Sequence, residues 1–127
     1  MSSRNVTVVG LQWGDEGKGK IVDALAGHMK YVVRFCGGAN AGHTVLVGDE
    51  KFALHLIPCG VLRKDVCNVV GSGVAFDPAT AWGELSALRE RGVSVTSDNF
   101  KVSSTASVVM PWHKLQDTLS ENALAKG

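Results

Sequence analysis

The chain has 127 residues, a length that suits one domain with a sizeable core. Its net charge of +1 excludes a broad positive field of the kind that attracts nucleic acid or an acidic membrane. No apolar run is long enough to span a bilayer and no signal-peptide pattern is present, so we expect a cytoplasmic protein without a membrane partner. Its three cysteines, an odd number without a CxxC pair, favour free thiols.

The first predicted unit is a strand, a loop and a helix. Residues 5–11 (NVTVVGL) are short, apolar and rich in valine, which predicts a buried strand. A polar, glycine-rich loop follows at 12–19. Residues 20–26 have helical spacing, and Gly27 is expected to end that helix. The buried face of the helix is predicted to carry Ile21, Val22 and Leu25.

The middle of the chain predicts four short strands. Residues 31–35 form the first and lead into a second glycine-rich loop. Residues 44–47 and 51–56, which includes His55, form the next two, joined by a tight turn at Gly48 and Asp49. The fourth, 68–70, is expected to end at the Gly71-Ser72-Gly73 step.

The last part of the chain predicts two helices around one strand. Asp77 is a suitable N-cap and Pro78 a suitable first helical residue, and Gly92 ends this helix. A strand is expected at 100–102, and Pro111 begins a helix that runs to the end of the chain. The predicted apolar stripes are Trp82, Leu85 and Leu88 on one helix, and Trp112, Leu115 and Leu119 on the other. Strands alternating with helices indicate an α/β fold with a mainly parallel sheet and flanking helices.

The loop between the first strand and helix has the character of a phosphate-binding loop. Its sequence from Gly10 is GLQWGDEGKGK, so glycine amides, two lysines and a helix N-terminus meet at one place. It departs from the usual P-loop, because six residues separate Gly10 from Gly17 and Gly19 replaces the Ser or Thr that binds magnesium. A carboxylate among phosphates requires a bridging cation, so Asp15 predicts bound Mg²⁺.

The second glycine-rich loop, 37–44 (GGANAGHT), carries a histidine and an asparagine. Loops that leave the carboxyl ends of neighbouring parallel strands share one crevice. Asp15 and His43 are therefore expected to flank one reaction centre as general base and general acid. The amide of Asn40 suits a purine edge, because it offers a donor and an acceptor. His28, His55 and His113 have no partner that the sequence identifies.

Other functions remain open from the residues alone. One alternative is another P-loop-like kinase or ligase that uses GTP or ATP, and a second is a non-catalytic GTP-binding module. The chain has no NKxD guanine motif, which such a module needs, and no GxGxxG dinucleotide fingerprint.

The two loops resemble those of one enzyme family. Residues 12–20 (QWGDEGKGK) resemble the signature segment of adenylosuccinate synthetases, and residues 33–44 (VRFCGGANAGHT) resemble the family's second nucleotide loop. Residues 54–62 and 71–74 also fit, and the resemblance thins after Arg91. Ala39 departs from the histidine-like side chain expected there, outside the catalytic pair.

The resemblance implies GTP-dependent ligation of aspartate to IMP, the first committed step from IMP to AMP. Asp15 would take the N1 proton of IMP, whose 6-oxygen would attack the γ-phosphate of GTP. His43 would stabilise the transferring phosphoryl group or donate a proton, and Lys18 would also serve catalysis. Aspartate would then displace phosphate from 6-phosphoryl-IMP, which gives adenylosuccinate and GDP.

The resemblance also implies the binding residues. GTP would be held by Gly14, Asp15, Glu16, Gly17, Lys18, Gly19, Lys20, Gly42, His43 and Thr44. IMP would be held by Asp15, Glu16, Gly17, Lys18, Asn40, Ala41, Gly42 and His43. One Mg²⁺ per subunit would bind the Asp15 carboxylate and the Gly42 carbonyl.

Members of this family are longer than this chain. Residues 1–127 are expected to be the N-terminal part of a single larger GTP- and IMP-binding domain, roughly its first third. Guanine and aspartate recognition would lie outside the chain, so we expect the chain alone to be inactive. As an isolated piece it is expected to expose a sheet edge and apolar helix faces. A homodimer is implied for the full-length enzyme.

Overall fold

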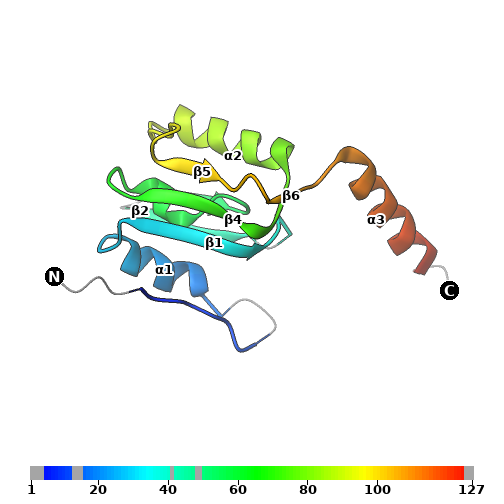
Figure 1. The fold of residues 1–127 in the computed structure, drawn as a ribbon, viewed down its shortest axis with the longest axis horizontal. Coiled ribbons are helices and arrows are strands. Elements are labelled where there is room, and N and C mark those ends of the chain that lie inside the picture. Colours follow the sequence, from blue (N-terminus) through cyan, green and yellow to red (C-terminus); the bar gives the residue numbers. More distant parts are fainter. Residues whose placement is uncertain (1–4, 13–15, 41, 48–49, 125–127) are drawn as a thin grey trace.

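The computed structural model describes residues 5–12, 16–40, 42–47 and 50–124, with the backbone alone for His43, Leu46 and Val47. Three helices, six strands and one 3₁₀ turn lie in this part of the chain (Figure 1). In chain order these elements are α1 (Lys18–Ala26), β1 (Tyr31–Gly37), β2 (His43–Val47), β3 (Glu50–Leu54), η1 (Cys59–Leu62), β4 (Cys67–Phe76), α2 (Pro78–Glu90), β5 (Phe100–Val102), β6 (Ser107–Val108) and α3 (Pro111–Leu124).

A parallel sheet organises the molecule and confirms the predicted fold class. β4 is its central strand, with β1 on one side and, on the other, β5 followed by β6. All of these pairs are parallel. β2 and β3 form a separate antiparallel hairpin, as predicted, although its turn residues Gly48 and Asp49 lie outside the described residues.

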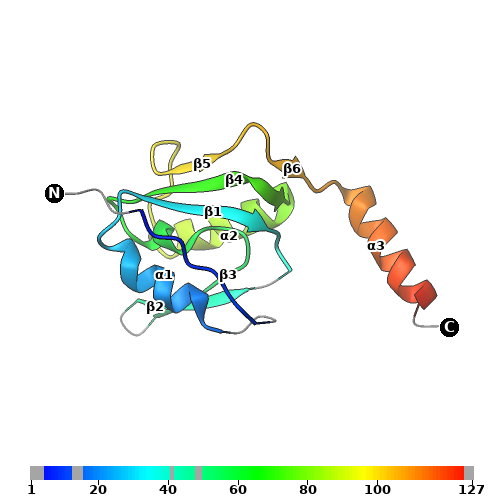
Figure 2. The same cartoon turned by 60° about the horizontal axis from the view of Figure 1, so that its bottom comes forward.

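The core lies on one face of the parallel sheet. The two views of the ribbon place α1, α2 and the hairpin on the same side of the sheet (Figures 1 and 2). Val70 and Val74 of β4 belong to one buried cluster with Leu54 of β3 and with Ala81 and Leu88 of α2. A smaller cluster joins Ala26, Val32 and Val66.

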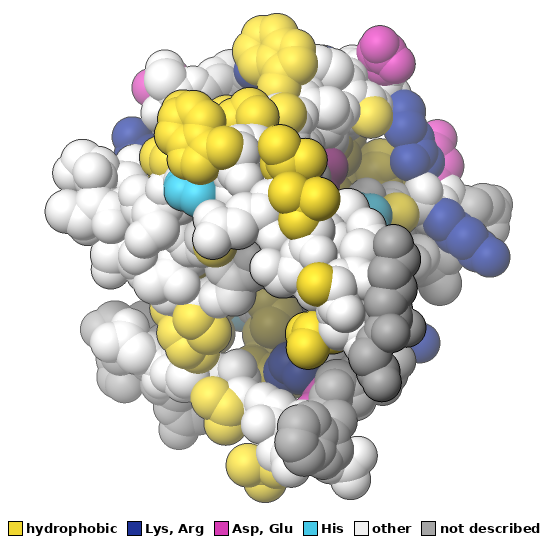
Figure 3. Space-filling model, turned by 90° about the vertical axis from the view of Figure 1, so that its right-hand side faces the viewer, with side chains coloured by type: hydrophobic (Ala, Val, Ile, Leu, Met, Phe, Trp, Pro, Cys, Tyr) yellow, Lys and Arg dark blue, Asp and Glu magenta, His cyan; other side chains and the backbone are white. Residues whose placement is uncertain are grey.

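The opposite face of the sheet is open to solvent. Tyr31, Val33 and Phe35 of β1 are 63%, 53% and 53% exposed, whereas Val32 between them is buried. α3 projects away from the sheet (Figures 1 and 2), and its apolar residues Trp112, Leu115 and Leu119 are exposed. Hydrophobic side chains also gather on the upper part of the face seen in Figure 3. Parallel sheets are normally covered on both faces, and the exposed apolar side chains of α3 match the expected exposed apolar helix face.

The ends of α2 follow their local sequence closely. The Asp77 side chain accepts a hydrogen bond from the amide of Ala79, which makes Asp77 the predicted N-cap. At the other end Gly92 adopts φ 80°, and its amide and that of Val93 donate to the last-turn carbonyls of Arg89 and Leu88. This is a Schellman ending, which requires the left-handed conformation that glycine adopts freely. None of the helices that the structure describes is long and apolar enough to cross a bilayer.

The predicted strand at 5–11 was wrong. The segment has no strand pairing, and Val6, Val9 and Leu11 are exposed. A valine-rich run indicates a preference for burial, but burial also needs a neighbouring strand and a covering layer. Neither is present around this segment in the described structure.

The strand predicted at 68–70 is longer than expected. β4 continues through Gly71 and Gly73 to Phe76, with an irregularity in its pairing to β1 between Arg34 and Cys36. A Cβ at Gly73 would lie 2.5 Å from the carbonyl oxygen of Phe35. The glycines here permit close approach of two backbones and do not end the strand. β3, by contrast, ends at Leu54, so that His55 lies after the strand.

The predicted apolar faces were partly wrong. Ile21 is 55% exposed on α1, where Val22 and Ala26 pack inward, and Trp82 is 67% exposed on α2, where Ala81 is buried beside Leu88. The helical spacing defines a stripe only to within one residue. In each helix an alanine lies on the side that faces the core, and the neighbouring large side chain lies outward.

Candidate functional site

The described ends of the two glycine-rich loops lie at one edge of the molecule. The N-terminal end of α1, which the first loop precedes, is at the same edge as the C-terminal end of β1, from which the second loop leaves (Figure 1). α1 also contacts β2, the element that follows the second loop. The ends of both loops that the structure describes therefore lie near one another, and the shared crevice stays a prediction.

The central pair of that prediction lies outside the described residues. Gly14, Asp15 and Ala41 are not described, and His43 is described only as the first backbone position of β2. The convergence of Asp15 and His43, and the magnesium site that depends on Asp15, therefore stay predictions.

The described part of the first loop is built around the Glu16 carboxylate. Its Oε1 accepts a hydrogen bond from the amide of Gln12 at 3.1 Å, and its Oε2 forms an ion pair with Lys18 Nζ. The hydrogen bond from Lys18 lowers the pKa of Glu16 to about 2. Both side chains lie over Gly10, where a Cβ would be only 2.6 Å from Glu16 Oε1 and from Lys18 Nζ. The Glu16 carboxylate therefore already places one negative charge at the N-terminal end of α1.

Gly17 sets the start of α1 at this loop. It adopts φ 79°, and its carbonyl accepts the amides of Lys20 and Ile21 at 3.0 and 3.4 Å. The helix begins at Lys18, two residues earlier than predicted. Lys18, Gly19 and Lys20 therefore occupy the first turn, where the helix dipole favours an anion. The structure brings these three predicted phosphate ligands together.

The second loop begins where β1 ends. Gly37 adopts φ 87°, and the carbonyl of Gly38 accepts a hydrogen bond from Arg34 Nη2 at 2.5 Å. Ala39 is half-buried against the main core, whereas Asn40 is exposed. The Asn40 side chain is therefore not packed into the core and is accessible to a ligand.

Predicted residue Thr44 lies in β2, opposite Ala53 of β3. Gly42 lies immediately before β2, and a Cβ there would be 2.7 Å from two atoms of the His55 ring. The second loop therefore ends at β2, and His55, which directly follows the paired strand β3, lies beside Gly42.

Two polar side chains near this loop, Arg34 and Glu84, were not identified from the sequence. Arg34 also donates to the carbonyl of His55, so one guanidinium links the second loop to the residue after β3. Glu84 of α2 accepts hydrogen bonds from the amides of His55, Leu56 and Ile57. In the sequence, Arg34 stands out only as a charged residue within the otherwise apolar run of β1. No local signal identified Glu84, because its partners are 27 to 29 residues away.

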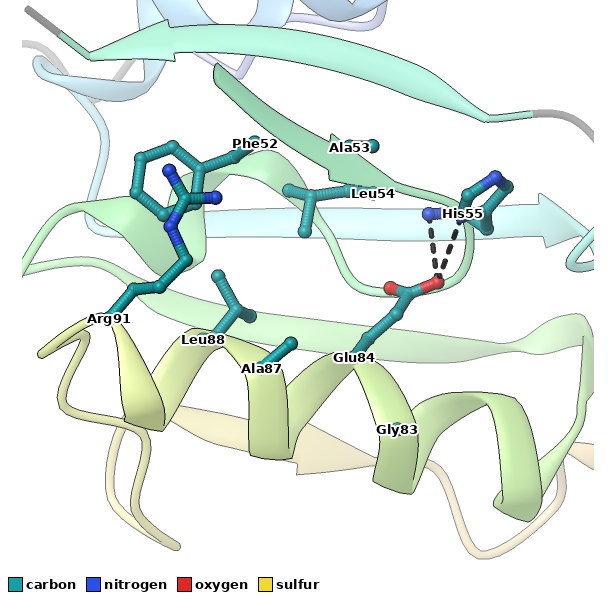
Figure 4. A pocket seen from close by; sticks show the side chains of 9 residues that line it. All are labelled: Phe52, Ala53, Leu54, His55, Gly83, Glu84, Ala87, Leu88 and Arg91. Carbon is teal, nitrogen blue, oxygen red and sulfur yellow. Dashed lines mark hydrogen bonds and ion pairs between the residues drawn. The ribbon is translucent and has the colours of Figure 1, made fainter. Parts of the chain in front are cut away.

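A cavity of about 270 Å³ lies between β3 and α2 (Figure 4). His55 and Glu84 lie at one end of it, and Arg91 stacks over the Phe52 ring at the other, 3.7 Å from its centroid. None of the predicted site residues that the structure describes lines it; its lining residues are Phe52, Ala53, Leu54, His55, Gly83, Glu84, Ala87, Leu88 and Arg91.

Comparison with known proteins identifies the family. The family described as adenylosuccinate synthetase matches residues 7–127. The chain is 54% identical over 119 residues to adenylosuccinate synthetase of Desulfosudis oleivorans and 51% identical over 119 residues to that of Clostridium novyi; each match covers 94% of this chain and 28% of the relative. A solved structure of fully ligated adenylosuccinate synthetase from Plasmodium falciparum has a TM-score of 0.76 at 40% identity, over 92% of this chain and 27% of that one.

These matches include both glycine-rich loops. The chain spans about 28% of the length of the curated relatives that it matches. The family match alone covers nearly all of it, from residue 7 to residue 127, and the chain therefore belongs to the adenylosuccinate synthetase family.

Proposed function

We propose that this chain forms the phosphate-binding part of an enzyme that ligates L-aspartate to IMP at the expense of GTP. The observation that carries the proposal is the family match over residues 7–127, which includes both loops. The placement of Lys18, Gly19 and Lys20 in the first turn of α1 supports it, because a helix N-terminus with local positive charge favours phosphate. The enzyme is further proposed to be a cytoplasmic homodimer of the AMP pathway.

In the proposed mechanism the reacting groups come from the two loops. Asp15 takes the proton from N1 of IMP, which makes the 6-oxygen a nucleophile toward the γ-phosphate of GTP. His43 stabilises charge on the transferring phosphoryl group or donates a proton, and Lys18 neutralises phosphate charge. Phosphoryl transfer depends mainly on positioning and on charge stabilisation, which loop amides and lysines provide. Aspartate then displaces the phosphate from the purine.

Magnesium fits the proposed donor set. A carboxylate from Asp15 and the backbone carbonyl of Gly42 are oxygen ligands, the type that Mg²⁺ prefers. When bound, the ion would neutralise charge between the triphosphate and the loop. Glu16 and Lys18 already pair with one another, so the phosphates of GTP would have to share the Lys18 ammonium with the Glu16 carboxylate.

A chimeric enzyme tests the proposal directly. The chain would replace the 119 matching residues of the Desulfosudis oleivorans relative, because the relatives are more than three times longer than the match. We expect adenylosuccinate to form only when GTP, IMP, aspartate and Mg²⁺ are all present. A folded chimera that forms none would contradict the proposal, as would a product that forms with IMP omitted.

The chain alone is expected to form no adenylosuccinate, because aspartate and guanine recognition are proposed to lie elsewhere in the enzyme. Titration calorimetry with GTP, IMP and both together separates this proposal from a different kinase and from a non-catalytic GTP-binding module. Only the proposed synthetase is expected to bind IMP at the same loops.

A further inference from the structure

The connection that follows β3 is held by one carboxylate. Glu84 lies on α2 and its side chain is only 10% exposed. Its Oε1 accepts the amides of His55 and Leu56 at 2.9 and 3.0 Å, and its Oε2 accepts those of Leu56 and Ile57 at 3.2 and 3.0 Å. Both oxygens are thus used by consecutive amides of the main chain. A buried carboxylate with this many partners fixes the backbone that donates to it.

The same connection is tied to the second glycine-rich loop by Arg34. One guanidinium nitrogen donates to the carbonyl of His55 and another to the carbonyl of Gly38, at 2.5 Å for the second bond. Glu84 and Arg34 thus hold His55 through its amide and its carbonyl, respectively. The backbone of His55 is therefore fixed on both sides, and the loop is fixed to it.

The His55 ring completes the link. Its Nδ1 lies 3.5 Å from Glu84 Oε1 (Figure 4). Its opposite edge lies against the backbone of Gly42, where a Cβ would be 2.7 Å from both Cδ2 and Nε2. The second loop is therefore contacted at both ends, at Gly38 by Arg34 and at Gly42 by His55.

We infer that Glu84 and Arg34 are positioning residues for the purine monophosphate, because together they fix the loop from Gly38 to Gly42 through His55. The inference rests on the proposed function, in which Asn40 and Gly42 contact IMP. Neither side chain touches a reacting atom. Their effect is to hold the loop in one conformation before the ligand arrives, which lowers the ordering cost of binding.

Glu84→Gln in the chimera is the sharpest test. The substitution keeps the shape of the side chain but replaces one acceptor oxygen by an NH₂ group, which faces amides that also donate. We expect the KM for IMP to rise about tenfold, as loss of one charge-assisted hydrogen bond can cause. The KM for GTP should rise less than the KM for IMP, because Lys18, Gly19 and Lys20 of the first loop form no hydrogen bond with Glu84. Of the proposed GTP ligands, only Gly42, His43 and Thr44 belong to the second loop. A merely destabilising change has no reason to separate the two values.

Val95→Ala is the matched control. Val95 is a buried member of the same core cluster and forms no part of the link described above. The smaller side chain should lower the unfolding temperature and leave both KM values unchanged. Arg34→Lys provides a second variant, because lysine keeps the charge but lacks the planar fork that reaches two carbonyls. It should reproduce the selective rise for IMP.

Hydrogen exchange gives a readout that needs no turnover. In Glu84→Gln the amides of residues 38–40 should exchange faster, while those of α2 keep their protection. If exchange and the KM for IMP are unchanged in an active chimera, or if both KM values rise equally, the positioning role is refuted and the proposed function stands. A folded wild-type chimera that makes no adenylosuccinate refutes the function and, with it, this inference.

Discussion

The Nζ atom of Lys114 lies 2.5 Å from Asp77 Oδ2, and this ion pair joins α3 to the start of α2. The same carboxylate caps α2 through the amide of Ala79 and accepts a hydrogen bond from the Thr80 hydroxyl at 2.5 Å. No residue of α3 is buried. One nearly buried carboxylate therefore begins one helix and anchors another.

Asp77 should make stability depend on pH at the acid end. Burial opposes ionisation, but the hydrogen bonds from Lys114 and Thr80 outweigh it and hold the pKa of Asp77 at about 2. The folded pKa lies below the unfolded value of about 3.9, so the stabilisation is complete above pH ~4 and is lost as pH falls toward 2. Asp77→Asn keeps a good N-cap and should flatten the pH dependence of the unfolding free energy between pH 4 and 2.

Asp77→Ala should cost about 1 kcal/mol at neutral pH, because the cap itself is lost. Lys114→Met is the control, since it removes the ion pair and keeps the cap. Urea unfolding at pH 7 measures the first effect, and NMR titration of the Asp77 carboxyl measures the rise in its pKa in Lys114→Met. A pKa of Asp77 that stays near 2 in Lys114→Met would contradict the role of Lys114 in lowering it.

Two glycines should respond oppositely to alanine. At Gly73 a Cβ would meet the Phe35 carbonyl oxygen at 2.5 Å, so Gly73→Ala must separate β1 from β4. Overpacking of this kind costs about 1–3 kcal/mol. Gly83 lies within α2, and a Cβ there meets nothing within 4 Å. Gly83→Ala should stabilise the chain by about 0.5–1 kcal/mol. Thermal unfolding of both variants measures the two effects. Destabilisation by Gly83→Ala would contradict the open space around Gly83.

The cysteines should differ in their reactivity. Cys36 is exposed, whereas Cys59 is buried. Burial, together with the neighbouring Asp23 carboxylate, raises the pKa of Cys59 to about 11. Thiolate is the reactive form, so iodoacetamide at pH 8 should modify Cys36 and leave Cys59 intact until the chain is unfolded in urea. Peptide mass spectrometry identifies the modified residues; early labelling of Cys59 would contradict its burial.

Lys18 should control the ionisation of Glu16. The ammonium group lowers the pKa of the Glu16 carboxyl to about 2. In Lys18→Met this pKa should rise toward the ordinary value of about 4.3. Lys20→Met is the control, since Lys20 is not paired with Glu16. NMR titration of the Glu16 side-chain carboxyl carbon distinguishes the variants. Equal pKa values of Glu16 in Lys18→Met and Lys20→Met would contradict the pairing of Lys18 with Glu16.

Asp15→Asn tests the proposed base. In the chimera the substitution should abolish turnover and leave measurable GTP binding, because asparagine cannot take the N1 proton. Calorimetry with GTP and an assay for adenylosuccinate separate the two effects. Asp98→Asn is a suitable control, as Asp98 lies before β5 and outside both loops. Turnover by Asp15→Asn close to that of the control would reject the role of Asp15.

Much of the fold could be predicted because its signals are local. Asp77 and Pro78 begin α2 and Gly92 ends it, since capping depends on a few neighbouring backbone groups. The parallel sheet follows from strands that alternate with helices. The phosphate-loop character of residues 16–20 was also visible, because glycines, lysines and a helix start are adjacent in the chain.

Other features depend on segments far apart in the chain. Which residue of a helix is buried, Ala81 and not Trp82, follows from the side of α2 that packs against the core. The segment 5–11 has the composition of a strand but no partner around it in the described structure.

The sequence by itself determined the local backbone preferences, the two loops and the family, because each depends on residues close together in the chain. Only the tertiary structure decided that Glu84 reaches the amides of His55, Leu56 and Ile57, and that Arg34 links His55 to Gly38. The physical reason is that a buried polar side chain is satisfied by whatever donors packing brings to it. Packing is set by the whole arrangement of helices and strands.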